Sequence, residues 1–171
     1  MRRILRRHEV VADDWHHLCE MDGAVTQNAR RTGLIVPLAE FRNNLSKWRD
    51  YQGPLGVRLS PADAVEELAA DLPRLSLVAA EFPGPGDGRG FTQGRLLRAR
   101  YHFRGDLRAV GAGVKQDLIF LMARCGFDSF ELAAGQSFEE AIRALSRYTV
   151  AYAPGEPLRA IERQRFHSSI G

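Results

Sequence analysis

The stretch Gly33-Leu34-Ile35-Val36-Pro37-Leu38 decides the fold, because it is a continuous apolar run without polar alternation. Such a run predicts a β-strand buried on both faces, as in the parallel sheets of α/β proteins. Apolar residues then recur at helical spacing between Ala39 and Tyr51, and Gln52-Gly53-Pro54 ends that segment. The first unit predicted by the sequence is therefore a strand followed by a helix.

The same strand-helix unit recurs along the chain. The predicted strands are 33–38, 55–59, 75–81, 107–111 and 129–132, and the predicted helices are 39–51, 62–72, 90–101, 114–124 and 138–150. Ser60-Pro61 predicts the N-cap and the first residue of the second helix. Strand starts recur about every 21 residues, except across the longer glycine-rich unit. This series predicts an α/β fold in which repeated βα units form a mainly parallel sheet.

Two architectures fit these units. We favour a flavodoxin-like open sheet, and a partial or dimer-completed TIM-like barrel is the alternative. In both architectures, ligands bind at the carboxyl ends of the strands. We therefore expect the loops after Leu59, Glu81, Gly111 and Leu132 to share one face.

The length of 171 residues suits one domain with flanking segments. Residues 33–152 are predicted to form the α/β domain. Residues 1–32 are interpreted as an extension of short strands and turns, with a hairpin through Met21-Asp22-Gly23, packed on the sheet edge. Residues 153–171 contain prolines and mixed charges and are expected to be a weakly ordered tail.

Composition and charge argue against several classes of protein. The formal net charge is only +3, and nearly all basic residues are arginine. A weak net charge disfavours a dedicated nucleic-acid binder, whereas the planar guanidinium suits carboxylate, phosphate and sulfur oxyanions. The apolar runs are much shorter than the roughly 20 residues of a membrane span, and no apolar signal core follows the basic start. We expect a cytoplasmic protein without nucleic-acid or membrane partners, and a homo-oligomer remains open.

The cysteines and histidines lack the spacing of a metal site. Cys19 and Cys125 are far apart and belong to no CxxC or Cys/His cluster, which predicts reduced thiols. Cys125 follows a predicted helix end, where no helix N-terminus lowers its pKa, so a buried inert thiol is favoured. His16, His17 and His102 show no ligand spacing with acids or cysteines. The sequence predicts no metal and no evident cofactor.

Segment 84–92 (GPGDGRGFT) is the most distinctive part of the chain, because it places glycines, a carboxylate, an arginine and a hydroxyl before a predicted helix. Backbone N–H groups at a helix start carry partial positive charge, and Arg89 can hold a phosphate, sulfite or carboxylate. The segment matches neither a GxxxxGK[ST] phosphate loop nor a correctly placed GxGxxG fingerprint. A flexible loop capped by Asp87 or Thr92 is the alternative.

Segment 111–117 (GAGVKQD) is expected to face the same crevice, since it also follows a strand. It offers an ammonium and two polar side chains, and an ordinary helix entrance is the alternative. The predicted anion-binding residues are Gly88, Arg89, Gly90, Thr92, Lys115 and Gln116, and the catalytic candidates are Asp87, Arg108 and Asp117.

Arg108 lies within the predicted strand 107–111, where its apolar neighbours make a charged side chain unexpected. A buried guanidinium needs a partner, and Asp117 or Glu131 on neighbouring units can supply one. Such a pair forms either a structural ion pair or the polar floor of a ligand site.

Several short motifs occur between Asp87 and Asp128: Asp87-Gly88-Arg89-Gly90-Phe91, Arg95-Leu96-Leu97-Arg98, Gly105-Asp106-Leu107-Arg108-Ala109-Val110-Gly111, Gln116-Asp117 and Arg124-Cys125-Gly126-Phe127-Asp128. Together they resemble a bacterial family of unknown function, domain-of-unknown-function family 934. The resemblance covers roughly residues 34–132, whereas Gly94 and the neighbourhood of Lys115 depart from the pattern.

The resemblance implies a role in assimilatory sulfite reduction, because members are commonly encoded beside sulfite reductase and described as oxidoreductases of sulfite reduction. The sequence contains neither a dinucleotide fingerprint nor ligands for a haem or iron-sulfur cluster. We favour an accessory protein that binds the reductase system or an anionic sulfur metabolite. The alternative is an enzyme of reductive sulfur assimilation, in which Arg89 and Arg108 hold an oxyanion and Asp87 or Asp117 moves protons.

Overall fold

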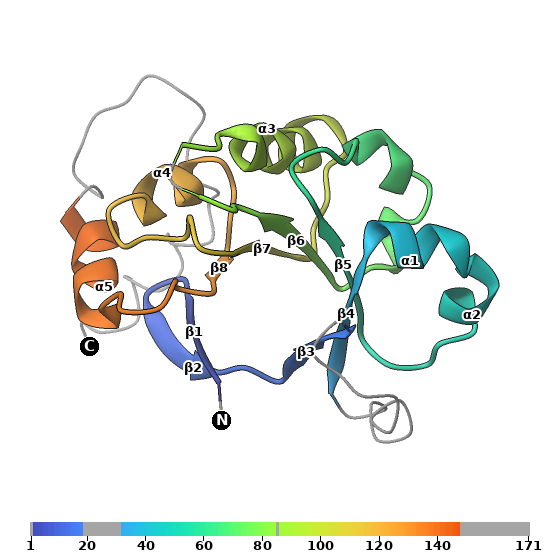
Figure 1. Cartoon of the computed structure of the whole chain (residues 1–171), viewed down its shortest axis with the longest axis horizontal. Helices are drawn as coiled ribbons and strands as arrows, with labels where there is room; N and C mark the ends of the chain where they lie inside the picture. Colours follow the sequence, from blue (N-terminus) through green and yellow to red (C-terminus); the bar gives the residue numbers. More distant parts are fainter. Residues whose placement is uncertain (1, 19–31, 85, 148–171) are drawn as a thin grey trace, which may run out of the picture.

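The computed structural model describes residues 2–18, 32–84 and 86–147 of the chain (Figure 1). These residues form a mixed α/β structure around one curled sheet of eight strands, which makes a half-barrel. The strands are β1 (Arg3–Arg6), β2 (Glu9–Ala12), β3 (Trp15–His17), β4 (Gly33–Pro37), β5 (Leu55–Leu59), β6 (Leu77–Glu81), β7 (Asp106–Val110) and β8 (Ser129–Phe130). The predicted α/β class is confirmed.

The sheet order is β2-β1-β8-β7-β6-β5-β4-β3. Strands β3 to β8 are parallel neighbours in chain order, and β1 pairs antiparallel with both β2 and β8. The mainly parallel sheet is confirmed, and its five predicted strands lie in sequence order. A flavodoxin-like sheet reverses its strand order at a switch point, and β3 to β8 contain no such reversal.

The curl of the sheet follows from the connection between its two end strands. β2 and β3 lie at opposite ends of the order, yet only Asp13 and Asp14 separate them in the chain. Because the three Cα–Cα steps from Ala12 to Trp15 span only about 10 Å even when extended, the sheet ends must come close together. The Asp13 amide donates to the Arg2 carbonyl at 2.9 Å, and the Gly33 amide donates to the Asp14 carbonyl at 3.0 Å.

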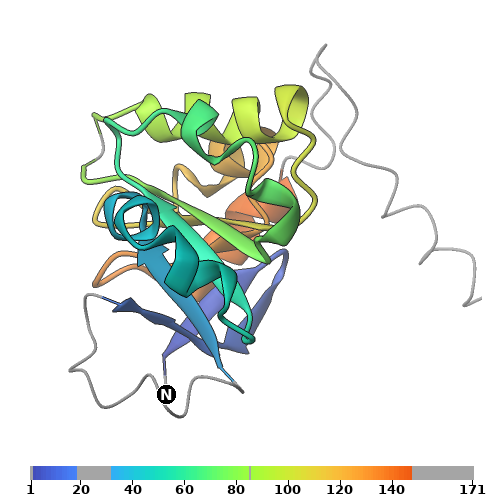
Figure 2. The ribbon, with the colours of Figure 1, turned by 90° about the vertical axis from the view of Figure 1, so that its right-hand side faces the viewer.

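The helices cover the outer face of the curl, whereas β1 to β3 complete its remaining side (Figures 1 and 2). They are α1 (Leu38–Asn43), α2 (Leu45–Arg49), α3 (Arg89–Arg95), α4 (Ile119–Arg124) and α5 (Phe138–Arg147), with 3₁₀ turns at Val65–Leu68 and Leu72–Arg74 and a π-helical turn at Leu96–Arg100. No helix in this described part of the chain is both long and apolar enough to cross a membrane.

Two apolar clusters lie on opposite faces of the sheet because strand side chains alternate. The larger cluster joins outward residues such as Val57 and Leu107 to helical residues such as Leu97 and Met122. The smaller cluster lies inside the curl and consists of Ile35, Leu77, Ala79 and Val110, with Trp15 packed against it. Fully buried strands therefore appear as continuous apolar runs in the sequence.

Several predicted elements differ in length or type. The predicted helix 39–51 is divided at Asn44, and the helix predicted over 114–124 begins only at Ile119. The predicted helix 62–72 is wrong, because 3₁₀ turns replace it. Ser60 therefore caps no α-helix, and its backbone amide donates to the Asp63 carboxylate at 2.7 Å within the turn that follows β5.

The N-terminal strands belong to the main sheet, where β1 and β8 pair. The described hairpin joins β1 to β2 through Arg7 and His8, and Arg7 adopts a positive φ of 58°. The hairpin predicted at residues 21–23 and the predicted tail 153–171 lie outside the described residues.

Substitution of Gly111 tests the turn that ends β7. Gly111 has φ of 105°, and an added Cβ would lie 2.5 Å from the Phe82 carbonyl oxygen. We expect Gly111→Ala to lower the free energy of unfolding by about 2 kcal/mol, because it combines backbone strain with a steric clash. Gly84→Ala is the matched control, since its Cβ would meet no atom within 4 Å. Equal stabilities of the two variants in urea denaturation would contradict the requirement for glycine at this turn.

Candidate functional site

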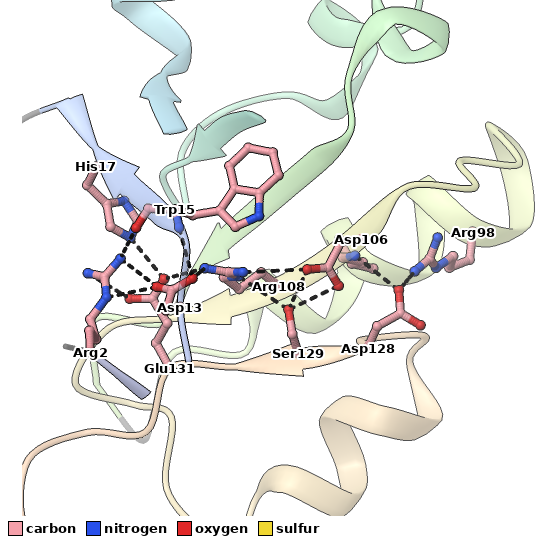
Figure 3. A network of polar contacts seen from close by, with 11 residues as sticks. Arg2, Asp13, Trp15, His17, Arg98, Asp106, Arg108, Asp128, Ser129 and Glu131 are labelled. Atoms are coloured by element: carbon pink, nitrogen blue, oxygen red, sulfur yellow. Dashed lines mark hydrogen bonds and ion pairs between the residues drawn. The ribbon is translucent and has the colours of Figure 1, made fainter. Parts of the chain in front are cut away.

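A polar cluster lies inside the curled sheet (Figure 3). Strand alternation turns Leu107 and Ala109 outward to the helices, and it turns Asp106 and Arg108 inward. Ser129 and Glu131 approach from the neighbouring strand β8 and the residue just beyond it. The segment containing β2 and β3 contributes further side chains from across the interior, so distant parts of the chain meet there.

Arg108 is the centre of this cluster and is only 1% exposed. Its guanidinium donates to the Asp13 carboxylate at 2.9 Å and to Glu131 at 3.3 Å, and it lies 3.6 Å from an Asp106 oxygen. Its Nε also donates to the Ser129 hydroxyl at 3.3 Å. Of the two partners predicted as alternatives for Arg108, Asp117 and Glu131, Glu131 contacts it.

Asp13 connects Arg108 to the junction between β2 and β3. Its carboxylate has no solvent-exposed surface and accepts hydrogen bonds from Arg2 Nε at 2.8 Å and the Trp15 amide at 3.2 Å. The Trp15 ring lies in space that side chains at Gly33 and Gly56 would occupy. The Asp13 side chain therefore lies inside the curl, and the two glycines leave room for the Trp15 ring.

His17 and Glu131 form a second pair at the carboxyl ends of the strands, with Nε2 and Oε1 2.9 Å apart. Burial raises the pKa of Glu131, but the hydrogen bond and charge of His17 and the charges of Arg2 and Arg108 produce a net pKa below the ordinary value. His17 is 4% exposed, and its Nδ1 is buried without a hydrogen-bond partner among the described residues. The pair can hold or move a proton.

The charges of this interior cluster largely compensate one another. Asp13, Asp106 and Glu131 surround the guanidiniums of Arg108 and Arg2, and Arg2 also contacts Glu131 at 3.6 Å. An oxyanion bound at Arg108 would compete with carboxylates already in place. Arg108 therefore acts as a structural cation that holds these carboxylates together.

A separate ion pair lies towards the amino ends of β7 and β8. Arg98 binds the Asp128 carboxylate and donates to the carbonyls of Gly126 at 2.9 Å and Gly105 at 3.0 Å. The Asp128 carboxylate also accepts the Leu107 amide at 3.1 Å. Arg98, another arginine of the family-like motifs, therefore joins the π-helical turn to the sheet.

The predicted anion-binding segment 84–92 places Asp87 beside Arg89. Arg89 Nη2 lies 2.6 Å from Asp87 Oδ2, and the Arg89 side chain is 60% exposed. The side-chain hydrogen bond from Arg89 lowers the pKa of Asp87, and the same bond raises the pKa of Arg89. Thr92 lines a shallow pocket with Arg89, whereas Gly90 packs closely over the Phe82 ring.

The segment 111–117 lies next to the start of this loop, since a Cβ at Gly113 would lie 2.7 Å from the Gly84 carbonyl oxygen and the Gly113 amide donates to the Phe82 carbonyl at 2.7 Å. Its side chains have other contacts: Gln116 accepts the Ser137 amide at 3.0 Å and also bonds Glu140 of α5. Lys115 is half-buried, and Asp117 is exposed. The two loops therefore lie side by side, but their polar side chains do not converge: Gln116 bonds to Glu140 of α5, whereas Arg89 pairs with Asp87.

Cys125 follows α4, as the sequence predicted, and is half-buried. Burial raises the pKa of its thiol, which disfavours the reactive thiolate. Among the described residues, no group of three His, Cys, Asp or Glu side chains is arranged to hold a metal ion.

Sequence reasoning missed the roles of Asp13 and His17. Asp13 lies 95 residues from Arg108 in the chain, and His17 lies 114 residues from Glu131. The signal in the sequence was the acidic pair Asp13-Asp14 between two short strand-like segments. This pair marks a connection between strands, but it does not identify Arg108 as the distant partner of Asp13. Asp117, the other suggested partner of Arg108, instead lies exposed in the loop after β7.

One known protein family matches a large part of this chain. The family described as "Bacterial protein of unknown function (DUF934)" matches residues 56–158. The chain belongs to this DUF934 family. A search of curated proteins finds no match. The DUF934 match includes Arg89, Arg108 and Glu131, but Asp13 and His17 precede it.

Removal of Arg108 tests whether the interior cluster supports the fold. Arg108→Met is expected to lower the free energy of unfolding by about 3 to 5 kcal/mol, because it leaves buried carboxylates without their cation. Arg42→Met is a control at an exposed ion pair and is expected to cost about 0 to 1 kcal/mol. Urea denaturation measures both effects, and similar losses would contradict the assigned role of Arg108.

The lowered pKa of Glu131 predicts a pH-dependent contribution to stability. Its carboxylate contributes fully above the ordinary pKa near 4.5, and the contribution disappears as the pH falls through the lower folded-state pKa. The difference in unfolding free energy between the parent protein and Glu131→Gln should therefore narrow below about pH 4.5. Denaturation over a pH series measures this difference, and a constant value would contradict the predicted linkage.

Proposed function

We propose that this DUF934 protein is an accessory protein of assimilatory sulfite reduction, which binds the reductase system or an anionic sulfur metabolite. The family resemblance supplies the connection to sulfite reduction, and the match over residues 56–158 supports the family on which it rests. The geometry of the arginines supports an accessory role over a catalytic one.

The observation that carries this choice is the internal pairing of the two arginines proposed to hold an oxyanion. Arg108 is surrounded by Asp13, Asp106 and Glu131, and Arg89 is paired with Asp87. A site that stabilises a developing oxyanion needs donors aimed at that anion. Because both guanidiniums already pair with carboxylates of the chain, we favour binding of the reductase system over catalysis on an oxyanion.

An enzyme of reductive sulfur assimilation is the second candidate, and the His17–Glu131 pair specifically supports it. A buried histidine hydrogen-bonded to a carboxylate is a common arrangement for proton transfer. This pair also lies at the carboxyl ends of parallel strands, where α/β proteins commonly bind ligands. In this alternative, His17 and Glu131 replace Asp87 and Asp117 as the principal proton-transfer candidates.

Deletion of the gene tests the proposed role in sulfur assimilation. Growth on sulfate or sulfite is expected to fall, while growth on cysteine is preserved because cysteine bypasses sulfite reduction. The parent gene should restore growth when supplied in trans. Immobilised protein should also bind purified sulfite reductase from the same host in biolayer interferometry. Normal growth of the deletion strain on sulfate and sulfite would remove the proposal.

Variants of the histidine pair distinguish the accessory protein from the enzyme. An accessory protein predicts that folded His17→Gln and Glu131→Gln variants restore growth as well as the parent does. His16→Gln is a matched control because His16 is the exposed neighbour of His17. If both interior variants fold but fail to rescue, while His16→Gln succeeds, the enzymatic candidate replaces the accessory one.

A further inference from the structure

A shallow pocket of about 230 Å³ lies on the outer layer of the protein, between the turns after β5 and helix α3. Ala64, Val65 and Leu96 supply apolar parts of its lining. Asp63 and Gln93 supply polar parts. This pocket is separate from the His17–Glu131 pair, which lies inside the sheet.

Gln93, one of the residues that line the pocket, has a hydrogen-bond acceptor without a partner among the described residues. Its side-chain nitrogen donates to the carbonyls of Ser60 at 2.8 Å and Asp63 at 3.0 Å, which fixes the orientation of the amide. Gln93 is only 5% exposed, and its Oε1 is buried without a hydrogen-bond partner among the described residues. A buried amide oxygen requires a donor, so the missing partner is an N–H or O–H group.

The charges around the pocket favour a cationic donor. Asp63 accepts the Ser60 amide, but its carboxylate forms no ion pair with any described residue. Glu66 faces Arg100 at 3.7 Å, and both side chains are more than half exposed, which makes this a weak pair. Arg89 also lines the pocket, but Asp87 already neutralises it.

The apolar and polar linings together match a charged side chain with an aliphatic stem. We propose that this pocket binds an arginine or lysine side chain of a partner protein. The stem packs against Ala64, Val65 and Leu96, while the cationic head donates to Gln93 Oε1 and faces Asp63 and Glu66. The inference rests on the proposed accessory function and names the chemistry that its protein partner presents.

Titration of small cations tests the pocket independently of sulfur assimilation. The probes are n-butylguanidinium and n-butylammonium, added to the ¹⁵N-labelled full chain. Saturable shifts are expected for the Gln93 side-chain amide and the backbone amides of Val65 and Leu96, with Kd on the order of millimolar for such small ligands. n-Butanol and butyrate are controls without a cation. Equal shifts with butyrate, or scattered shifts that do not saturate, would overturn the proposal.

Paired variants separate binding in the pocket from a general surface effect. Ala64→Phe is expected to abolish the saturable shifts by filling the pocket, whereas Ala69→Phe places the same ring at an exposed position outside its lining. Glu66→Gln should weaken cation binding roughly 2- to 5-fold, whereas Glu67→Gln should leave it unchanged. Unaltered binding to Ala64→Phe, or equal loss in both phenylalanine variants, would place the cation elsewhere.

Comparison of the two cations identifies the partner side chain. Tighter binding of n-butylguanidinium indicates arginine, and tighter binding of n-butylammonium indicates lysine. The same variants then test the partner in biolayer interferometry with purified sulfite reductase, where Ala64→Phe should weaken binding and Ala69→Phe should not. Reductase binding unaffected by Ala64→Phe would remove the pocket as its docking point. A normal deletion strain would instead remove the sulfur-assimilation role while leaving the cation titration valid.

Discussion

The buried ion pair between Asp13 and Arg108 is the constraint on which the rest of this structure depends. Asp13 lies in the two-residue connection between the end strands of the sheet, and Arg108 lies near the sheet's middle on β7. Their contact therefore holds the N-terminal strands across the curled interior. Desolvating both charges is unfavourable, but the additional hydrogen bonds to Arg2, Trp15 and Ser129 satisfy their remaining polar groups.

The use of arginine for structural contacts changes how the arginine-rich composition should be interpreted. Arg108 organises the interior, and Arg98 joins the π-helical turn to Asp128 near the amino ends of the strands. Arg89 stabilises its own loop through Asp87. The planar guanidinium of Arg108 or Arg98 binds several acceptor groups at once, and that of Arg89 binds both oxygens of one carboxylate, geometries that an ammonium serves less well. An abundance of arginine thus does not by itself identify an oxyanion site.

Local sequence patterns predicted the strands more successfully than the connections. The run at Gly33–Pro37 became β4 because its residues can pack on both faces of a parallel sheet, and Leu55–Leu59 became β5 for the same reason. Ser60 was predicted to cap an α-helix, but 3₁₀ turns follow it, and the side chain of Gln93 donates to the carbonyls of Ser60 and Asp63 in that connection. The partner of Arg108 at Asp13 depends on the curl of the sheet, which periodicity along the chain does not encode.

Two buried polar atoms without a hydrogen-bond partner among the described residues, His17 Nδ1 and Gln93 Oε1, differ in their position relative to the family match. Gln93 Oε1 is an acceptor, whereas His17 Nδ1 is an acceptor in a neutral imidazole whose Nε2 donates to Glu131 and a donor in a charged imidazole. Every residue of the Gln93 pocket lies within the matched segment 56–158, whereas His17 lies before it. The outer pocket is therefore built wholly from the family segment, while the interior site also requires the N-terminal strands. A function common to the family can thus rest on the outer pocket alone, and a function of the His17–Glu131 pair must include the strand contributed from outside that segment.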